Sequence, residues 1–465
     1  RVAGQAEAPP GGSAALDVWF RPAAERARAI DGFTLRFRVL AGERVVPAGP
    51  GALARAVAEA APGDVLLLAP GRHDGPVVLD RPVTLDGAGR AVLDGRGTGS
   101  VVVVTGEDVT VRGLEIRGSG SSQQDIDSGV RLIPPAIRAR IEGNRIVGNL
   151  HGVDVHGALD SVVSGNTIIG RTDRRVNDRG NGVYVWKAPG TVVEGNDISL
   201  GRDGIFSNAS SKGTYRNNLF RDLRFAVHYM HTNEGEVSGN VSIGNYLGFA
   251  LMFSNRIVVH DNLSLRDHAH GFMLNYANNV DMRGNLVRGG TEKCTFIYNA
   301  HRNAIVGNRF ENCEIGIHFT AGSERNRLSG NAFIGNRNQV KYVGTRFVEW
   351  SDESRGNYWS DHPAFDLDGD GLADSPFRPN DLMDHILWSQ PAAKLLLGSP
   401  AVQLVRWSQA TFPAILPGGV VDSHPLMVAP EIAVPARIAE MEAAAQPAWL
   451  LERTNDADLD PVAGH

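Results

Sequence analysis

A phrase ending in asparagine recurs along the chain at a nearly fixed interval, and this period restricts the fold more than any other feature. From Ile141 onward, successive copies place the asparagine 22, 30, 22, 22, 22, 23, 23 and 23 residues apart. A period in the low twenties is typical of a solenoid, in which each repeat buries its apolar side chains only by stacking on its neighbours. The repeated residues are Asn144, Asn166, Asn196, Asn218, Asn240, Asn262, Asn285, Asn308 and Asn331.

The segments between these asparagines predict strands. Residues 152–155 and 316–319 alternate apolar and polar side chains, and long helical windows are absent. Leucine-rich repeats share the period, but their Leu-x-x-Leu-x-Leu skeleton is missing. We therefore predict an all-β chain folded as a right-handed parallel β-helix. Asparagine suits a tight corner because it tolerates left-handed backbone, and stacked copies can form an amide ladder, so we interpret the repeated asparagines as structural.

Segments at both ends of the repeat predict caps. Leu53, Val57 and Ala61 lie at i, i+4 and i+8, which predicts a capping helix over 51–61 that would protect the open end of the sheet. Ser399 and Pro400 form a typical helix start. The expected organisation is an N-terminal extension over 1–50 and a β-helix with its helical cap over 51–345. A C-terminal cap with a loop and helices follows over 346–430, then a peripheral helix and tail over 431–465.

Composition excludes several classes of protein. With 42% hydrophobic and 21% charged residues, the chain is not intrinsically disordered. No apolar run approaches the ~20 residues that cross a bilayer, so membrane contact is expected only through a partner. A net charge of -6 argues against nucleic-acid binding through bulk electrostatics. The sequence begins at Arg1 and soon becomes rich in Gly and Pro, so we expect an exported chain from which a signal peptide has been removed.

Alternation within the strands predicts an apolar strip on the outside of the β-helix. Positions that should point outward carry aromatic residues at both ends of the strip, and methionine and histidine in its middle. A contiguous exposed apolar strip usually marks a partner or ligand surface. The predicted partner-contact residues are Tyr184, Trp186, Phe206, Phe296 and Tyr298.

The middle of the strip predicts a copper site. Met230 and Met252 hold the same position on adjacent rungs, and His228 precedes Met230 by two residues on the same face. His231 follows Met230, and Met273 occupies the next rung. Thioether sulfur together with imidazole favours the soft cation Cu(I), so we expect these five residues to bind copper. The alternative is an adaptable methionine-rich contact surface without a metal.

One interval of the repeat contains an insertion rich in arginine. The 30-residue spacing between Asn166 and Asn196 places extra residues in one rung, where they should project as a loop. This loop is either a docking element or a solvated charged segment. Its arginines are Arg171, Arg174, Arg175 and Arg179.

A second candidate metal site lies beyond the last repeat. The segment from Asp366 to Asp374 has carboxylates at alternate positions and resembles the first nine positions of a calcium loop. Phe377 stands where an EF-hand has its twelfth-position glutamate, so an EF-hand itself is not implied. We expect a structural Ca2+ site, with a plain Asx-turn loop as the alternative. The expected ligands are Asp366, Asp368, Asp370, Leu372 and Asp374.

The chain contains two cysteines, Cys294 and Cys313, which fall on neighbouring rungs. An exported location would permit a disulfide between them. The alignment offsets them by a few residues, so geometry could also forbid the bond. The sequence leaves both possibilities open.

The C-terminal part contains five distinctive phrases. They are Gly-Asn-Tyr-Trp-Ser-Asp from residue 356, Asp-Leu-Asp-Gly-Asp-Gly from 366, Arg-Pro-Asn-Asp-Leu-Met-Asp from 378, Lys-Leu-Leu-Leu-Gly-Ser-Pro-Ala-Val from 394 and Val-Val-Asp-Ser-His-Pro-Leu-Met from 420. These phrases resemble the NosD family of periplasmic β-helix proteins that act in nitrous oxide reductase maturation. The opening rungs are similar to that family as well, so the resemblance covers nearly the whole chain.

The resemblance implies a periplasmic partner of an ABC transporter made of an ATPase and a membrane subunit. It implies a role in supplying copper, or sulfur, to the copper-sulfide centre of nitrous oxide reductase. A copper chaperone and the apo nitrous oxide reductase would be its clients. The resemblance carries over no copper ligands residue by residue, so the His and Met set remains an inference from the strip.

Two other classes of function compete with this one. A carbohydrate-binding or polysaccharide-cleaving β-helix enzyme would need clustered carboxylates on the strip, but the strip offers Asp154 without a second acid beside it, and Asp203 lies at a corner. A scaffold could instead hold the reductase without touching metal. We predict that the chain is not an enzyme and that it binds copper.

Overall fold

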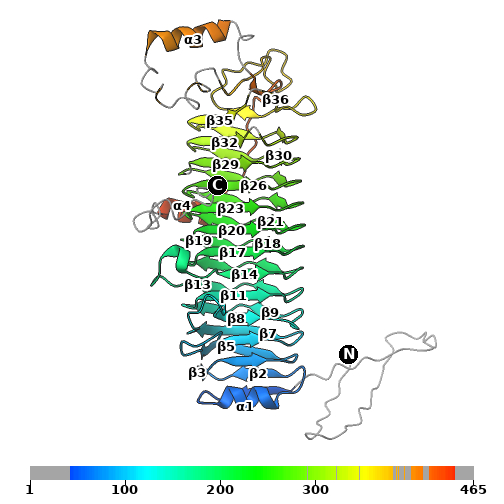
Figure 1. Cartoon of the computed structure of the whole chain (residues 1–465), viewed down its shortest axis with the longest axis vertical. Coiled ribbons are helices and arrows are strands. Elements are labelled where there is room, and N and C mark those ends of the chain that lie inside the picture. The colour runs from blue at the N-terminus through cyan, green and yellow to red at the C-terminus, as the bar shows by residue number, and fades with distance from the viewer. Residues whose placement is uncertain are drawn as a thin grey trace, which may run out of the picture. The chain divides into compact units, whose positions relative to one another are not determined.

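The structure is a computed structural model that describes residues 42–380 except positions 291, 321 and 345, the isolated positions 384, 386 and 392, and residues 399–411 and 418–445. Outside the described residues lie the expected N-terminal extension up to residue 41, the other positions between 381 and 398, and the expected tail from residue 446. Within the described part, the chain forms a parallel β-solenoid (Figure 1). The predicted fold class is confirmed.

Strands of successive rungs pair in parallel, and the register shifts once, between β5 and β7. One sheet contains β4 (Val77–Leu79), β6 (Val102–Val104), β8 (Ser128–Leu132), β11 (His151–His156), β14 (Val183–Trp186), β17 (Asp203–Asn208), β20 (Phe225–Met230), β23 (Leu247–Met252), β26 (His270–Asn275), β29 (Lys293–Tyr298), β32 (Ile315–Thr320) and β35 (Asn338–Val343). We call these twelve strands the site sheet because they carry the predicted strip.

The remaining walls of the solenoid belong to a second hydrogen-bonded set of 24 strands. These are β1 (Glu43–Val46), β2 (Val65–Leu68), β3 (Gly71–Asp74), β5 (Thr84–Asp94), β7 (Thr110–Arg117), β9 (Arg140–Glu142), β10 (Arg145–Val147), β12 (Val162–Ser164), β13 (Thr167–Ile169), β15 (Val192–Glu194), β16 (Asp197–Ser199), β18 (Thr214–Arg216), β19 (Leu219–Arg221), β21 (Glu236–Ser238), β22 (Val241–Ile243), β24 (Val258–His260), β25 (Leu263–Leu265), β27 (Asp281–Arg283), β28 (Leu286–Arg288), β30 (Ala304–Val306), β31 (Arg309–Glu311), β33 (Arg327–Ser329), β34 (Ala332–Ile334) and β37 (Tyr358–Trp359). Two more strands, β36 (Phe347–Glu349) and β38 (Gly419–Val421), pair with each other.

The repeated asparagines form a continuous ladder inside one corner of the solenoid. The main-chain N–H of Asn218 donates to the side-chain oxygen of Asn240 at 3.0 Å. In the same way, the main-chain N–H of Asn240 donates to the side-chain oxygen of Asn262 at 3.0 Å. The side-chain amide of Asn240 also donates to the carbonyl of Tyr215 at 2.8 Å. Each side chain therefore satisfies main-chain groups that a buried turn would otherwise leave without partners. The predicted structural role of these asparagines is confirmed.

The interior is filled by the inward side chains of the rungs, as the alternation predicts. Val227, Phe249 and Phe272 occupy matching positions on three successive rungs of the site sheet and are at most 1% exposed. At the first end, helix α1 (Ala52–Glu59) buries Leu53 and Ala56, so the predicted capping helix is confirmed. Strand β1 pairs with β2, which places sheet structure upstream of residue 51.

Among the described residues, two further helices lie in the C-terminal part. A short 3-10 turn, η1 (Val176–Asp178), lies in the insertion. Helix α3 (Pro400–Thr411) begins directly after Ser399, whose hydroxyl accepts a bond from the N–H of Val402 at 3.4 Å. Helix α4 (Ala436–Ala444) lies beside the solenoid (Figure 1). No helix of the described residues has the length and apolarity that a membrane span needs.

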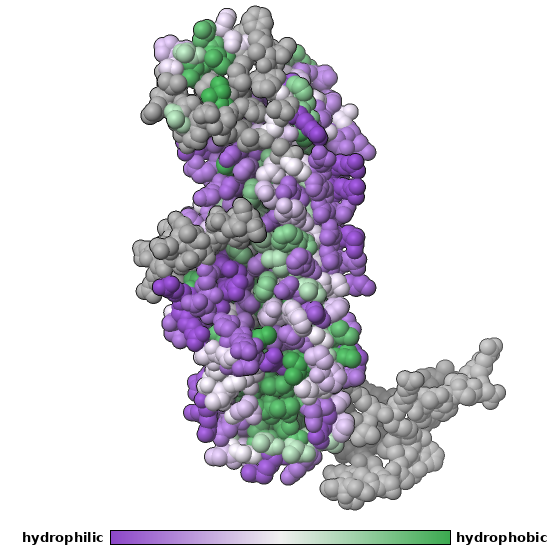
Figure 2. Space-filling view, viewed as in Figure 1, coloured by the Kyte–Doolittle hydropathy of each residue, from purple (hydrophilic) through white to green (hydrophobic). Residues whose placement is uncertain are grey.

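The segment that carries α4 packs on the outer face of strands β22, β25 and β28. Ile438 and Met441 join an apolar cluster with Leu263 of the solenoid. Arg288 and Glu442 form an ion pair at 2.6 Å across the same contact. The visible face elsewhere is mostly hydrophilic, with hydrophobic residues gathered toward the end where α1 lies (Figure 2).

Cys294 of β29 and Cys313 of the following turn are joined in a disulfide. Their Cα atoms are 5.8 Å apart, which is an ordinary distance for such a bond. The bond resolves the alternative that the sequence left open, and it ties neighbouring rungs together covalently.

Candidate metal centre

The register of three adjacent strands brings the predicted copper ligands together. Met230 of β20 lies opposite Met252 of β23. His228 lies opposite Ala250, which in turn lies opposite Met273 of β26. Neighbouring strands are about 4.8 Å apart, so one imidazole and three thioethers surround the small side chain of Ala250. We call these four ligand candidates, His228, Met230, Met252 and Met273, the metal grid.

The metal grid lies on the outer face of the site sheet but is largely shielded from water. Met273 is fully buried, and His228 and Met252 are each 5% exposed. Met252 and Met273 belong to an apolar cluster that is separate from the solenoid core, and the partly buried Met230 packs against this cluster. The expectation of an outward strip agrees with this arrangement. The expectation that its centre is exposed was wrong, because outward side chains of adjacent rungs pack on one another and on Val176 of the insertion.

A carboxylate holds the imidazole of His228 in place. The Nδ1 atom of His228 lies 3.1 Å from the Oδ2 atom of Asp203 on β17, and the guanidinium of Arg224 donates two bonds to the same carboxylate at 2.8 and 2.7 Å. With its proton on Nδ1, the ring presents an unprotonated Nε2. This Nε2 is buried and has no hydrogen-bond partner among the described residues. A histidine oriented by a carboxylate, with its other nitrogen free, is the usual form of a metal ligand.

The electrostatics of this pair favour a neutral imidazole. Burial lowers the pKa of His228, although the bond to Asp203 opposes that change. Burial alone would raise the pKa of Asp203, but the Arg224 guanidinium and the His228 bond bring it well below its usual range. The carboxylate is therefore charged and compensated by Arg224, and His228 has a free lone pair at neutral pH.

His231, the fifth residue of the predicted copper set, lies outside the metal grid, and copper binding by any of the five stays a prediction. His231 is exposed on the turn after β20 and has left-handed backbone with a φ of 51°. Its ring stacks on Phe253 at 5.2 Å between centroids. The alternation of the strand ends at Met230, because the left-handed corner turns the next side chain away from the sheet face.

Sequence reasoning missed three residues around the metal grid. Asp203 and Arg224 orient His228, and His270 lies three residues before Met273 on β26 and is 7% exposed. Burial lowers the pKa of His270 to about 3, so this ring is neutral as well. Strand alternation gave no signal for Asp203 or His270, because a residue three places before an outward position is expected on the opposite face.

At one end of the strip, aromatic residues of neighbouring rungs form stacked pairs. Tyr184 and Phe206 stack with centroids 5.3 Å apart, and Trp186 stacks on His156 at 4.0 Å. Phe296 is buried, and Tyr298 is only half-buried beside it. Contact between these residues and a partner stays a prediction.

Two arginines of the insertion hold it to the solenoid. Arg171 donates to the carbonyls of Gly148 at 2.8 Å and Ser119 at 2.9 Å. Arg179 is 3% exposed and donates to the carbonyl of Arg174 at 3.0 Å. Arg174 is half-buried, and Arg175 is exposed. A docking role for the insertion stays a prediction that would depend on Arg174 and Arg175.

The predicted calcium loop brings three of its acids together. Single carboxylate oxygens of Asp366, Asp368 and Asp370 lie within 4.8 Å of one another. Asp374 instead accepts a bond from the N–H of Leu367 at 2.7 Å. Leu372 pairs with Leu426 in an isolated bridge. Calcium binding at this loop stays a prediction.

A parallel β-solenoid with a carboxylate-held histidine and three thioethers on one outer wall defines a binding protein that offers soft metal ligands. The chain belongs to the NosD family. The family described as "Periplasmic copper-binding protein (NosD)" matches residues 164–364. This description agrees with the periplasmic location and the copper that the sequence predicts.

Two relatives establish the membership over most of the chain. The "Probable ABC transporter binding protein NosD" of Stutzerimonas stutzeri is 40% identical over 374 residues, covering 77% of this chain and 86% of that protein. Its counterpart from Pseudomonas aeruginosa is 40% identical over 376 residues, covering 78% and 88%. Among solved structures, the A-module of the mannuronan C-5 epimerase AlgE6 of Azotobacter vinelandii has a TM-score of 0.50 and 16% identity, covering 62% of this chain and 89% of that module. At that identity the likeness concerns the fold alone.

Proposed function

We propose that this chain is the periplasmic, non-catalytic partner of an ABC transporter and carries Cu(I) on the metal grid. Its cargo would serve the copper-sulfide centre of nitrous oxide reductase. The transporter's ATPase and membrane subunit, a copper chaperone and the apo-reductase would be its partners. Support comes from the family description, from the transporter role in the names of the two relatives, and from the chemistry of the grid.

The observation that carries the proposal is the free, buried Nε2 of His228 beside three methionines. A buried polar atom without a partner costs free energy, so its retention needs a reason. Cu(I) supplies one, because it accepts imidazole nitrogen and thioether sulfur as ligands. The carboxylate of Asp203 would keep the imidazole of His228 oriented with Nε2 available to the ion.

Delivery would proceed by ligand exchange without chemistry on the cargo. The grid lies on a sheet whose neighbouring strands are fully paired, so its ligands keep their positions when the ion leaves. Met230 is the least buried of the three methionines and would be the first to yield to a client's ligand. The aromatic pairs at the two ends of the strip would contact that client.

Anaerobic titration with Cu(I) against a chromogenic competing chelator tests the proposal. The full chain is expected to bind copper tightly, and Met230→Leu/Met252→Leu is expected to weaken binding by more than about tenfold, since even outer-shell substitutions cost that much. The matched control is Met282→Leu, because Met282 is buried in the solenoid core. Asp203→Asn should also weaken binding and should change the ¹⁵N shifts that report which nitrogen of His228 carries the proton.

The competing functions predict different results. Unchanged copper binding in the double variant would show that copper binds elsewhere and would remove the metal grid as the site. Absence of copper binding by the unaltered chain would instead support a scaffold without metal. Release of oligosaccharides from a polyuronate by the purified chain would instead support the carbohydrate-active alternative.

A further inference from the structure

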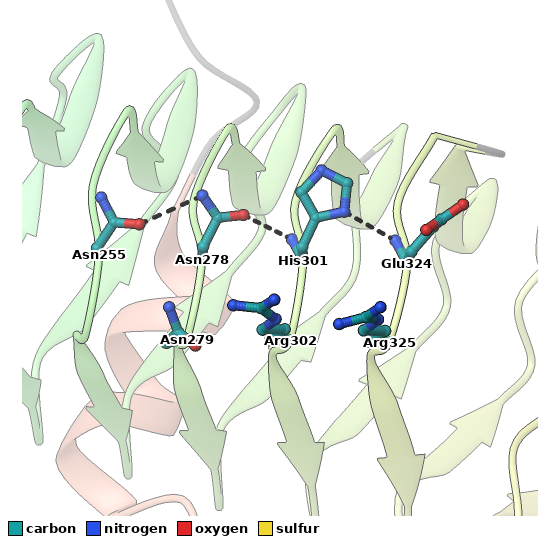
Figure 3. A pocket seen from close by; sticks show the side chains of 7 residues that line it. All are labelled: Asn255, Asn278, Asn279, His301, Arg302, Glu324 and Arg325. Atoms are coloured by element: carbon teal, nitrogen blue, oxygen red, sulfur yellow. Dashed lines mark hydrogen bonds between the residues drawn. The ribbon is translucent and has the colours of Figure 1, made fainter.

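A hollow of about 430 Å³ lies along the turns that follow β23, β26, β29 and β32 (Figure 3). Two rows of turn residues border it. One row contains Asn255, Asn278, His301 and Glu324, and the other contains Arg302 and Arg325. Nothing in the copper function uses these residues.

The first row is a hydrogen-bonded ladder that fixes the hollow's upper border (Figure 3). The amide of Asn278 donates to Asn255 at 3.2 Å, and the main-chain N–H of His301 donates to Asn278 at 2.8 Å. The N–H of Glu324 donates to Nδ1 of His301 at 3.1 Å. Because Nδ1 accepts this bond, the neutral ring carries its proton on Nε2 and offers a donor.

The second row places two positive charges side by side. Arg302 and Arg325 take equivalent left-handed turn positions on successive rungs, with φ values of 58° and 59°. Rungs are about 4.8 Å apart, and in Figure 3 both guanidinium groups lie below the ladder and extend to the same side. Like charges on directly neighbouring strands repel each other.

These charges are not compensated within the described part of the chain. Neither Arg302 nor Arg325 forms an ion pair there, and Glu324 pairs with Arg346 at 2.9 Å. Earlier in the same row the fold does balance its charges, because Arg256 pairs with Glu234 at 2.6 Å. The hollow therefore has uncompensated positive charge, whereas the charge of Arg256 earlier in the row is compensated by Glu234.

We infer that this hollow is a binding site for oxyanion groups, carboxylate or phosphate, which both guanidinium groups engage. A guanidinium fork matches the two oxygens of such a group and donates parallel bonds to it. The volume exceeds that of one oxyanion, so the ligand carries its anionic group on a larger frame.

Calorimetric titration of the full chain at low ionic strength tests this site. The probes are inorganic pyrophosphate, for a free small ligand, and hexaglutamate peptide, for an acidic segment of another protein. One of them is expected to bind at one equivalent, and Arg302→Gln/Arg325→Gln to weaken it at least about tenfold. Arg302→Lys/Arg325→Lys keeps the charge but removes the forks, so it should also weaken binding.

Arg256→Gln is the matched control, since Arg256 has the same turn position and charge but is already paired. Binding of pyrophosphate identifies a small-molecule site, and binding of hexaglutamate alone identifies a docking site for an acidic segment. The inference is overturned if neither probe binds, or if Arg256→Gln weakens binding as much as the double variant does. Circular dichroism of each variant confirms that the fold is intact.

Discussion

At the scale of single residues, Asp154 is the group whose surroundings fit least with its chemistry. It lies on the outer face of β11, between Arg131 and Tyr184 in the register, and is fully buried. Neither carboxylate oxygen has a hydrogen-bond partner among the described residues, and the Arg131 Nε atom is 3.3 Å from Oδ2. Burial raises its pKa from 3.8 to about 7, although Arg131 acts in the opposite direction.

This shift makes a testable prediction about pH. The folded state holds the proton of Asp154 up to about pH 7, whereas the unfolded chain releases it near 3.8, so Asp154 lowers the free energy of unfolding as pH rises between these values. Asp154→Asn removes that loss. We expect the free energy of unfolding of the variant to exceed that of the wild type by on the order of 3 kcal/mol at pH 8. This difference should disappear at pH 4.

Urea unfolding at the two pH values measures the difference. The wild type also contains Asp267, whose pKa burial raises to about 7, and this residue is common to both proteins, so the comparison isolates Asp154. If the difference in free energy of unfolding between the variant and the wild type is the same at both pH values, Asp154 is ionised in the folded protein.

Residues also show how far a sequence can define a site. That the three methionines and His228 share an outer face could be predicted, because strand alternation dictates which side chains lie on one face. The position of His231 could not be predicted from alternation, because a left-handed corner follows Met230 directly. The bond from His228 to Asp203 could not be predicted, because it depends on side-chain conformations across 25 positions of the chain.

At the scale of the element, the asparagine ladder should contribute strongly to stability. Asn240 satisfies the N–H of Asn218 and the carbonyl of Tyr215, and both groups are buried. Asn240→Ala would leave them without partners, at a cost of roughly 2 to 5 kcal/mol for the two groups. Asn255→Ala is the matched control, because Asn255 belongs to the half-buried outer ladder, where water can replace the lost bonds. Equal shifts of the urea midpoint in the two variants would contradict a special role for the inner ladder.

Elements with local signals were predictable, and contacts between distant elements were not. The period of the asparagines predicts the stacked rungs, and the apolar spacing around Leu53 predicts α1. By contrast, the outer contact of α4 with β25 joins segments about 180 residues apart in sequence, as the bond from Arg266 to Ala445 shows. The shielding of the metal grid has the same origin, since alternation indicates the face of a side chain but not what packs on it.

At the scale of the whole molecule, a solenoid transmits perturbations poorly, because each rung contacts mainly its neighbours. The metal grid spans only β20, β23 and β26, whose register is continuous with the rungs on both sides. A cargo bound there should order its own rungs and leave distant rungs unchanged. This behaviour suits a carrier that presents an ion on a rigid surface, whereas a transporter subunit that closes around its cargo would change along its length.

Hydrogen exchange measured with and without Cu(I) under anaerobic conditions distinguishes these two modes. We expect added protection in peptides that contain β20, β23 and β26 and in the adjoining turns. Exchange in β4, β6 and β8 should stay unchanged because several complete rungs separate them from the grid. The Met230→Leu/Met252→Leu variant should show no added protection at the same copper concentration. Protection that extended to β4 would mean that copper reorganises the whole solenoid, and release by local ligand exchange would then no longer be an adequate mechanism.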